Sequence, residues 1–279
     1  DATGSAIIWA WYLNTHTGAE ATPYVLGDLN KETQFVLSRF DVDVPAVLES
    51  VDSDDQVVIV DTNNPQELFT NINETNITQI IDHHKLVGGL ETKGPIDITI
   101  RPMACTATIM IDLMGADAAK MPRAIKGAAL SCILSDTLEF RSPTTTEHDK
   151  ATAQRLAQEL DIDLGAYAAR MFEAKSDVSA FSDADLIRMD SKKYEVSGTQ
   201  FRVSVLETTA PQMVLDRKDS LLASMADVAR EDGVDEVLLF IVDILNEEAT
   251  LLIPNDTVKT VAQKSFGATV SGDTVVLDG

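Results

Sequence analysis

The sequence predicts an α/β protein with two domains: an N-terminal domain with a mostly parallel sheet flanked by helices, and a smaller α/β C-terminal domain. In the first two thirds of the chain, strand-like apolar segments alternate with helix-like segments, which is typical of parallel sheets. A stretch of small and polar residues at 173–185 then precedes a region of paired strands. The length of 279 residues is comfortable for two domains. We therefore expect domains at 1–174 and 186–279, joined by a hinge linker at 175–185.

The individual elements follow from the hydrophobic periodicity and the flanking turn residues. Helices are predicted at 6–14, 32–40, 106–114, 125–134, 148–160, 166–172, 213–230 and 258–266. Strands are predicted at 23–26, 57–60, 78–81, 96–100, 194–196, 201–206, 237–241, 250–253 and 274–277. The chain begins just before a helix and stops just after a strand, so we expect further segments beyond both ends.

The composition limits the functions that the chain can have. Its net charge is −23, which argues against nucleic acid as a partner because phosphate backbones are bound by clustered Lys and Arg. No apolar run approaches the ~20 residues that span a bilayer, so no membrane partner is expected either. Cys105 and Cys132 lie in apolar stretches and are expected to be buried thiols of a cytoplasmic protein. An acidic protein can still bind a small phosphate ligand where divalent metals invert the local charge.

The clearest chemical motif is Asp82-His83-His84, which follows an apolar strand. Side chains at the carboxyl end of a parallel strand point into the crevice where open α/β sheets bind ligands. Two imidazoles beside a carboxylate suit a divalent metal, although adjacent histidines can also simply cap a strand.

Three further carboxylates are candidates for the same crevice. Asp61 ends the strand at 57–60 and should open onto it, although a lone aspartate there is more often a turn residue. Asp136 follows an apolar run and, taken alone, fits a helix terminus. Asp1, taken alone, fits a helix N-cap.

The segment RPMACTAT at 101–108 leads from a strand into a helix. The N-terminus of that helix offers free amides and the positive end of a helix dipole to an anion. Cys105 is expected to pack there rather than react, because no histidine is close in sequence. His148 is interpreted as a solvated surface residue, and His16 as a loop residue without a partner.

Taken in order, these segments resemble the manganese-dependent, family II inorganic pyrophosphatases of the DHH phosphoesterase superfamily. The resemblance covers essentially the whole chain, and the C-terminal domain resembles the DHHA2 type. The matching segments are DATGSA at 1–6, LGDLNKETQF at 26–35, VIVDTN at 58–63, IIDHHKLVGGLET at 80–92, RPMACTATI at 101–109, LSDTLEFRSPT at 134–144 and FIVDILNE at 240–247. The resemblance implies hydrolysis of pyrophosphate to two phosphates by a hydroxide that two metal ions activate.

The resemblance also implies a ligand set. Asp61 would be the catalytic carboxylate that bridges two Mn²⁺ or Co²⁺ ions. Asp1, His83 and Asp136 would complete one of the two sites. The other ligands of the second site, and a basic tail, would lie in the segments expected beyond the two ends. A homodimer is compatible with the resemblance.

For the substrate, pyrophosphate with Mg²⁺, the resemblance implies that His84 and Lys85 face the phosphates and that His84 takes part in catalysis. Two positions depart from the family pattern. Thr62 stands where a histidine is frequent, and Gln200 stands where a substrate-binding lysine is expected. Arg202 lies on the same strand face as Gln200 and could partly substitute.

Other functions stay open at the level of sequence. A DHH phosphodiesterase that acts on short oligonucleotides or cyclic dinucleotides typically carries a Gly-Gly-Gly-His motif in its second domain. No such motif, and no histidine, follows residue 175. A polyphosphatase of similar architecture is compatible with the same motifs. A non-catalytic metal- or phosphate-binding regulator is a further alternative, but it would have no evident reason to keep four ligand positions together.

Overall fold

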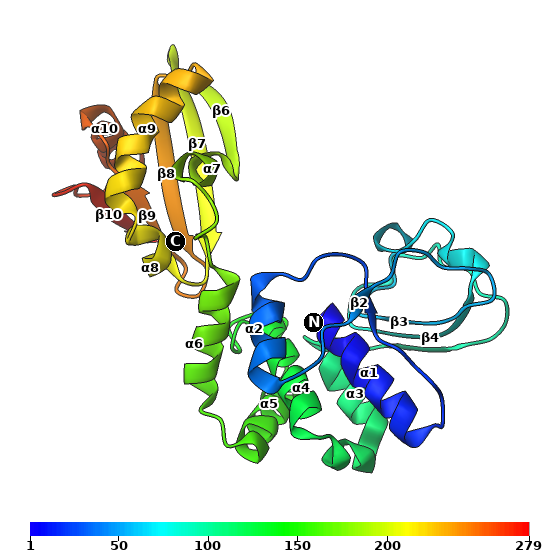
Figure 1. Cartoon of the computed structure of the whole chain (residues 1–279). Helices are drawn as coiled ribbons and strands as arrows, with labels where there is room; N and C mark the ends of the chain where they lie inside the picture. Colours follow the sequence, from blue (N-terminus) through cyan, green and yellow to red (C-terminus); the bar gives the residue numbers. More distant parts are fainter. Residues whose placement is uncertain (279) are drawn as a thin grey trace. The chain divides into compact units, whose positions relative to one another are not determined.

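The computed structural model describes residues 1–278 and divides the chain into two compact units, one from Asp1 to Met171 and one from Phe172 onward (Figure 1). Each unit contains a sheet and helices, so the α/β prediction is confirmed. Within the described residues, none of the helices is both long and apolar enough to cross a membrane.

The first unit has a three-stranded parallel sheet in the order β3-β4-β5. The strands are β3 (Gln56–Val60), β4 (Asn76–Asp82) and β5 (Asp97–Ile100). They are rich in β-branched residues, which favour extended backbone. The register places Val60 opposite Ile81, and the Asp61 amide continues the ladder by donating to the carbonyl of Ile81 at 2.9 Å. The carboxyl ends of β3 and β4 are therefore level, and the residues that follow them start side by side.

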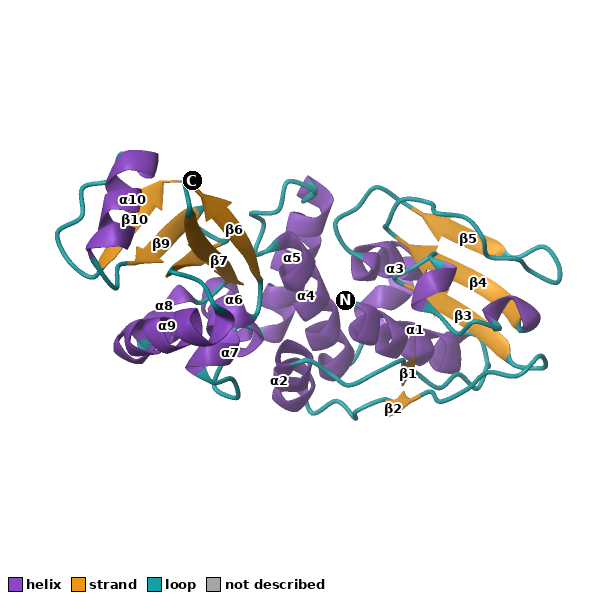
Figure 2. Ribbon diagram, turned by 90° about the horizontal axis from the view of Figure 1, so that it is seen from above, coloured by secondary structure: helices purple, strands orange, loops and turns teal. Residues whose placement is uncertain are grey.

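Six α-helices complete this unit together with a small parallel pair of strands, β1 (Tyr24–Val25) and β2 (Ala46–Val47). The helices are α1 (Ala2–His16), α2 (Lys31–Phe40), α3 (Thr106–Met114), α4 (Arg123–Thr137), α5 (Glu147–Leu160) and α6 (Leu164–Lys175), and short 3₁₀ helices lie at η1 (Pro65–Glu67), η2 (Ile72–Glu74) and η3 (Gly115–Lys120). Helix α1 contacts β3, and α3 contacts β4, so both lie against the sheet (Figure 2). Almost every residue of α4 from 127 to 134 is buried, which makes it the central helix of the unit.

The second unit has a five-stranded mixed sheet in the order β10-β9-β8-β7-β6. The strands are β6 (Ser191–Val196), β7 (Thr199–Thr208), β8 (Glu236–Asp243), β9 (Glu248–Leu252) and β10 (Thr274–Asp278), and the helices are α7 (Asp183–Arg188), α8 (Pro211–Leu215), α9 (Lys218–Asp232) and α10 (Asp256–Phe266). Alternate residues of β8 serve opposite faces: Leu239 packs in one core cluster with α9, whereas Leu238 packs in another with α10.

The structure corrects several element predictions. The stretch predicted as a linker is partly helical, since α6 continues to Lys175 and α7 begins at Asp183 with a Ser182 capping box. The helix predicted at 213–230 is two helices, α8 and α9, because the backbone leaves helical geometry at Arg217 and its guanidinium binds Asp183 at 2.5 Å. The strand β2 was not predicted, since two residues carry no periodicity.

Candidate metal centre

Four elements of the first unit bring the predicted ligands together. Asp61 directly follows β3, and His83 directly follows β4. Asp136 lies in the last turn of α4, and Asp1 is the N-cap residue of α1. Because the ends of β3 and β4 are level and α1, α3 and α4 pack on one another, the four side chains face a common point.

The ring of His83 is the centre of this arrangement. Its Nε2 lies 3.4 Å from Oδ1 of Asp61 and 4.0 Å from Oδ2 of Asp136. Its Nδ1 lies 3.1 Å from the carbonyl oxygen of Met103. A carbonyl only accepts, so Nδ1 carries a proton and Nε2 is turned toward the carboxylates. This is the orientation that a metal-ligating imidazole needs. Burial by itself would lower the pKa of His83, but the hydrogen bond and the charge of Asp61 outweigh it and raise the pKa.

Asp61 has an unusual backbone conformation for a residue with a side chain. Its φ is 63°, in the left-handed region, which aspartate and asparagine tolerate better than most residues. The ladder bond to Ile81 fixes its backbone, and the hydroxyl of Thr106 donates to its Oδ1 at 2.8 Å. The amide of Thr106 donates to Oδ2 of Asp1 at 2.9 Å. Thr106, the first residue of α3, therefore holds two of the carboxylates.

Asp136 carries the strongest sign that a cation belongs here. Its Oδ2 is buried and has no hydrogen-bond partner among the described residues. Burial raises the pKa of Asp136, and the negative charge of Asp61 raises it further. Ligand atoms of Asp1, Cys105 and Asp136 lie within 4.8 Å of one another, as do those of Asp61, His83 and His84. Carboxylate oxygens and imidazole nitrogens arranged around an unsatisfied buried oxygen fit a divalent cation such as Mn²⁺.

Cys105 is the thiol next to these carboxylates. Its side chain is fully buried, and burial raises the pKa of the thiol well above its usual value, with the charge of Asp136 adding to the effect. A neutral thiol is neither a nucleophile nor a good ligand. The expectation that Cys105 packs rather than reacts agrees with this environment.

His84 is held by the first residue of the motif. Its Nδ1 lies 2.8 Å from Oδ1 of Asp82, whose side chain is completely buried. The ring itself is 55% exposed, so Nε2 is presented to solvent at the rim of the centre. Lys85 follows it and is exposed. These two groups form a positive rim beside an acidic centre.

The predicted residues of the second unit lie in a different setting. Arg202 is buried in β7, where its Nε lies 2.8 Å from Oδ2 of Asp232 and its guanidinium donates to Ser191. Gln200 binds Glu195 across the β6–β7 hairpin at 2.9 Å. A role of Arg202 in substrate binding stays a prediction.

Several residues that matter to the centre escaped the sequence reasoning. The sequence places Thr106 at the start of a helix whose amides were expected to be free to bind an anion. In the structure the amide of Thr106 donates to Asp1 instead. Asp149 is fully buried, although its neighbour His148 is exposed on the same helix. It caps α5 through Thr146 and also accepts from Thr108 at 2.7 Å and from the amide of Ala104 at 3.1 Å. The capping spacing from Thr146 to Asp149 was the available signal.

One of the two remaining histidines differs from its interpretation. His148 is exposed, as the sequence indicates, and its Nε2 lies 2.8 Å from Asp112, which also binds Arg101. His16 is the last residue of α1 rather than a loop residue, and it stacks on Tyr12 and lies 3.8 Å from Asp117. Neither lies among the metal-ligand groups of the described residues.

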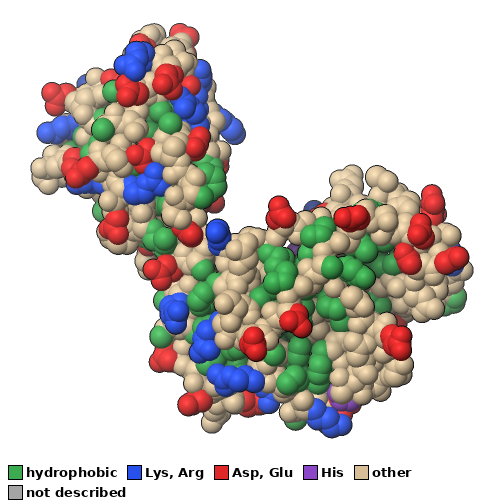
Figure 3. Space-filling view, viewed as in Figure 1, with side chains coloured by type: hydrophobic (Ala, Val, Ile, Leu, Met, Phe, Trp, Pro, Cys, Tyr) green, Lys and Arg blue, Asp and Glu red, His purple; other side chains and the backbone are tan. Residues whose placement is uncertain are grey.

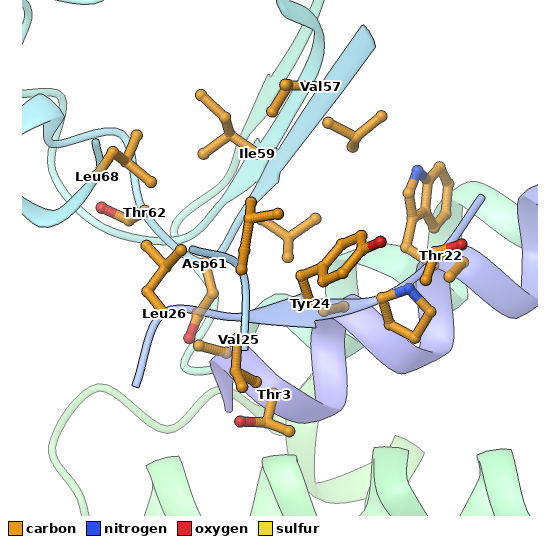
Figure 4. Close-up of a pocket in the computed structure, with 18 of the residues that line it drawn as sticks. Thr3, Thr22, Tyr24, Val25, Leu26, Val57, Ile59, Asp61, Thr62 and Leu68 are labelled. Atoms are coloured by element: carbon orange, nitrogen blue, oxygen red, sulfur yellow. The ribbon is translucent and has the colours of Figure 1, made fainter. Parts of the chain in front are cut away.

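Asp61 also lies at one end of a cavity of about 710 Å³ in the first unit. Figure 4 shows Asp61 and Thr3 at this end, with Tyr24 and Val57 along the walls. The walls are mostly apolar and come from α1, β1 and β3. Figure 3 shows hydrophobic side chains on the surface of this unit, where Tyr24, Leu26, Val44 and Val47 are its exposed large apolar residues near β1 and β2. Asp61 therefore lies between the acidic centre and a mostly apolar cavity.

Comparison with known proteins gives two matching family models. The DHH family, N-terminal domain, matches residues 1–135, and the DHHA2 domain matches residues 169–279. The DHHA2 match begins close to the start of the second unit, whereas the DHH match ends inside α4 of the first.

Similar whole chains carry a consistent name. A probable manganese-dependent inorganic pyrophosphatase of Lactobacillus johnsonii is 33% identical over 100% of this chain and 90% of its own length. One of Deinococcus radiodurans is 37% identical over 98% of this chain and 88% of its own length. A crystal structure assigned to a family II inorganic pyrophosphatase of Methanococcus jannaschii is 31% identical, with a TM-score of 0.62 over 99% of this chain and 90% of that one.

Proposed function

The chain belongs to the DHH-family inorganic pyrophosphatases, and on that premise we propose that it hydrolyses pyrophosphate to two phosphates at a manganese centre in its first unit. The observation that carries the proposal is the buried, unpartnered Oδ2 of Asp136 beside the ring of His83. A buried acceptor without a partner costs about 1–3 kcal/mol, so this oxygen supports a bound cation. Release of phosphate separates the enzyme from a regulator that binds metal without catalysis.

Four residues would hold the metal: Asp61, His83, Asp136 and Asp1. Two divalent ions bound here would shield the charge of pyrophosphate and lower the pKa of the attacking water. The tautomer of His83 and the hydrogen bonds from Thr106 keep the donor atoms in place before any ion arrives. Co²⁺ suits the same donors, and Mg²⁺ would accompany the substrate.

The rim residues would act on the substrate. The Nδ1–H of His84 already donates to the carboxylate of Asp82, so the ring would donate from Nε2 to a phosphate oxygen only in its protonated, imidazolium form. Lys85 would add a positive charge next to it, where negative charge increases in the transition state. Arg202 would serve the leaving phosphate only with the part of its guanidinium that Asp232 and Ser191 do not occupy. We further propose a cytoplasmic protein that does not use nucleic acid, and a homodimer is the assembly to test first.

The direct test is release of phosphate from pyrophosphate by the purified protein, with Mn²⁺, Co²⁺ and Mg²⁺ compared at equal concentration. Tripolyphosphate and a cyclic dinucleotide serve as competing substrates. We expect pyrophosphate with Mn²⁺ to give the highest rate. Faster turnover of the cyclic dinucleotide than of pyrophosphate would contradict the proposal and favour a phosphodiesterase.

A further inference from the structure

The backbone that carries His84 and Lys85 has no regular structure, yet it is tied down by one side chain. Asn63 follows β3 by three residues and is only 3% exposed. Its Nδ2 donates to the carbonyl of Lys85 at 3.1 Å, and its Oδ1 accepts from the amide of Val87 at 2.8 Å. One side-chain amide therefore bonds a carbonyl and an N–H of the turn that follows the two histidines. We call such a pair of bonds, from one asparagine to two nearby backbone groups, a bracket.

The same Nδ2 also completes the surroundings of Asp82. It donates to Oδ2 of Asp82 at 2.6 Å, while Oδ1 of Asp82 accepts from the ring and the amide of His84 and from the amide of His83. Asp82 is completely buried, so each of its oxygens needs donors. Without Asn63, Oδ2 would lose this partner, and the carboxylate would be free to turn away from the ring of His84.

A second asparagine makes the same kind of bracket farther along this segment. Nδ2 of Asn73 donates to the carbonyl of Gly89 at 2.9 Å, and its Oδ1 accepts from the amide of Glu91 at 3.0 Å. Asn73 is partly exposed, and among the described residues it forms no hydrogen bond with Asp82 or with either histidine of the motif. Both asparagines bond a backbone carbonyl and a backbone amide of the same segment. Only Asn63 also contacts Asp82 and the backbone of Lys85, the residues next to the proposed phosphate site.

We propose that Asn63 is a positioning residue for the pyrophosphatase reaction. It holds the ring of His84 through Asp82, and it holds Lys85 through the backbone of the turn, without touching the substrate. This inference rests on the proposed function of the centre, because it assigns His84 and Lys85 to the phosphates.

The test compares Asn63→Ala with Asn73→Ala in steady-state kinetics with Mn²⁺ and pyrophosphate. Loss of a group that orients a functional side chain typically costs about 10–100-fold, and we expect kcat/KM of Asn63→Ala to fall in that range. We expect Asn73→Ala to stay within about twofold of the wild type, because a partly exposed bracket should affect stability only slightly. Mn²⁺ affinity should change much less than kcat/KM. Equal kinetic losses in the two variants would overturn the proposal.

A second pair of variants removes the same bond from the backbone side, in case Asn63→Ala folds poorly. Val87→Pro deletes the amide that Asn63 accepts from, and Glu91→Pro deletes the one that Asn73 accepts from. Val87 is 55% exposed in an irregular segment, so the fold should survive. We expect a kinetic loss for Val87→Pro and little for Glu91→Pro. If Val87→Pro folds and has normal kinetics, the bond between Asn63 and this backbone amide does not position the phosphate-facing residues.

One measurement is independent of activity. In the metal-free wild type, the ring Nδ1–H of His84 should give the nitrogen NMR signature of a hydrogen-bonded imidazole, and Asn63→Ala should weaken it while Asn73→Ala leaves it unchanged. If the wild type releases no phosphate from pyrophosphate, the proposed function fails, and this spectrum still decides whether Asn63 orients the ring. An unchanged spectrum in Asn63→Ala would refute the positioning role.

Discussion

The carboxylates of the first unit's centre and those of the second unit are surrounded differently. Among the described residues, no ion pair joins Asp1, Asp61 or Asp136 to a lysine or arginine. In the second unit, Asp232 pairs with Arg202 at 2.8 Å and with Arg188 at 3.1 Å. Paired charges hold a fold together, whereas converging like charges weaken it unless a cation joins them. The difference separates acids that are paired within the fold from the acids that we propose as metal ligands.

A third kind of carboxylate lies between these two cases. Asp149 is more deeply buried than Asp61 or Asp136, and among the described residues it pairs with no lysine or arginine, but four hydrogen bonds from Thr146, Thr108 and the amide of Ala104 satisfy its oxygens. Burial by itself would raise the pKa of Asp149, yet the hydrogen bonds from Thr146 and Thr108 outweigh it and the pKa lies below its usual value. Donors alone can therefore stabilise a buried charge in this unit, which makes their absence at Oδ2 of Asp136 informative.

The largest expected effect is on activity, at the carboxylate that would bridge the ions. Asp61→Asn should lower kcat by at least about 100-fold, because an amide oxygen is a neutral and weaker ligand. The fold should remain, since asparagine tolerates the left-handed φ of 63° at this position. Phosphate release would be measured across a Mn²⁺ titration, with circular dichroism to confirm folding. His148→Ala, at an exposed ion pair with Asp112, is the control and should stay near the wild-type rate. A near-normal rate for Asp61→Asn at moderate Mn²⁺ would remove the bridging role.

The next effect is on stability, at the satisfied carboxylate. Asp149→Asn should lower the free energy of unfolding by about 1–3 kcal/mol. The substitution replaces one carboxylate oxygen by an NH₂ group, which would point at groups that themselves donate hydrogen bonds. The depressed pKa gives the sign of the pH dependence. The stabilising contribution of Asp149 is present above the ordinary aspartate pKa and is lost as the pH falls through the lower pKa of the folded state. Urea unfolding from neutral to acidic pH would show the gap between wild type and variant closing; a constant gap would contradict this account.

A smaller effect is expected at the ion pair of the second unit. Arg202→Met should cost about 1–2 kcal/mol, since Asp232 keeps Arg188 and the long apolar side chain preserves packing. Burial would raise the pKa of Asp232, but Arg188 and Arg202 lower it, so this contribution also disappears as the pH falls. Mn²⁺ binding, measured by calorimetry, should not change. A loss of Mn²⁺ affinity in Arg202→Met would show that the comparison between the two units is wrong.

The smallest effect has the opposite sign. In metal-free protein, Asp136→Asn should raise the free energy of unfolding by about 1 kcal/mol at neutral pH, because it removes a buried charge that faces Asp61. The pKa of Asp136 is raised, so the gain should disappear below the ordinary aspartate range, where the carboxyl is protonated in both states. Added Mn²⁺ should reverse the order by stabilising the wild type more than the variant. Destabilisation by Asp136→Asn without metal would mean that this acid serves the fold.

The sequence by itself determined the elements with long, regular patterns and the identity of the candidate ligands. Apolar strands such as β3 and β8 and the amphipathic helices were predicted because periodicity is a local property. The position of Asp61 and of the Asp82-His83-His84 motif at one crevice followed from a general rule, that strand ends in a parallel sheet open onto the same edge. The choice of Asp1, Asp61, His83 and Asp136 as the ligand set came from the family resemblance.

Only the tertiary structure decided how those side chains are held. Asn63 and Thr106 act on partners that are 19 to 105 residues away, and a hydrogen bond of that range leaves no period in the sequence. The orphaned oxygen of Asp136, the buried cap of Asp149 and the pairing of Arg202 with Asp232 likewise depend on which helix and strand meet. Residue type determines what a group can donate or accept. Whether its partner is a backbone amide, an arginine or a metal ion depends on packing, which brings distant segments within about 3 Å of each other.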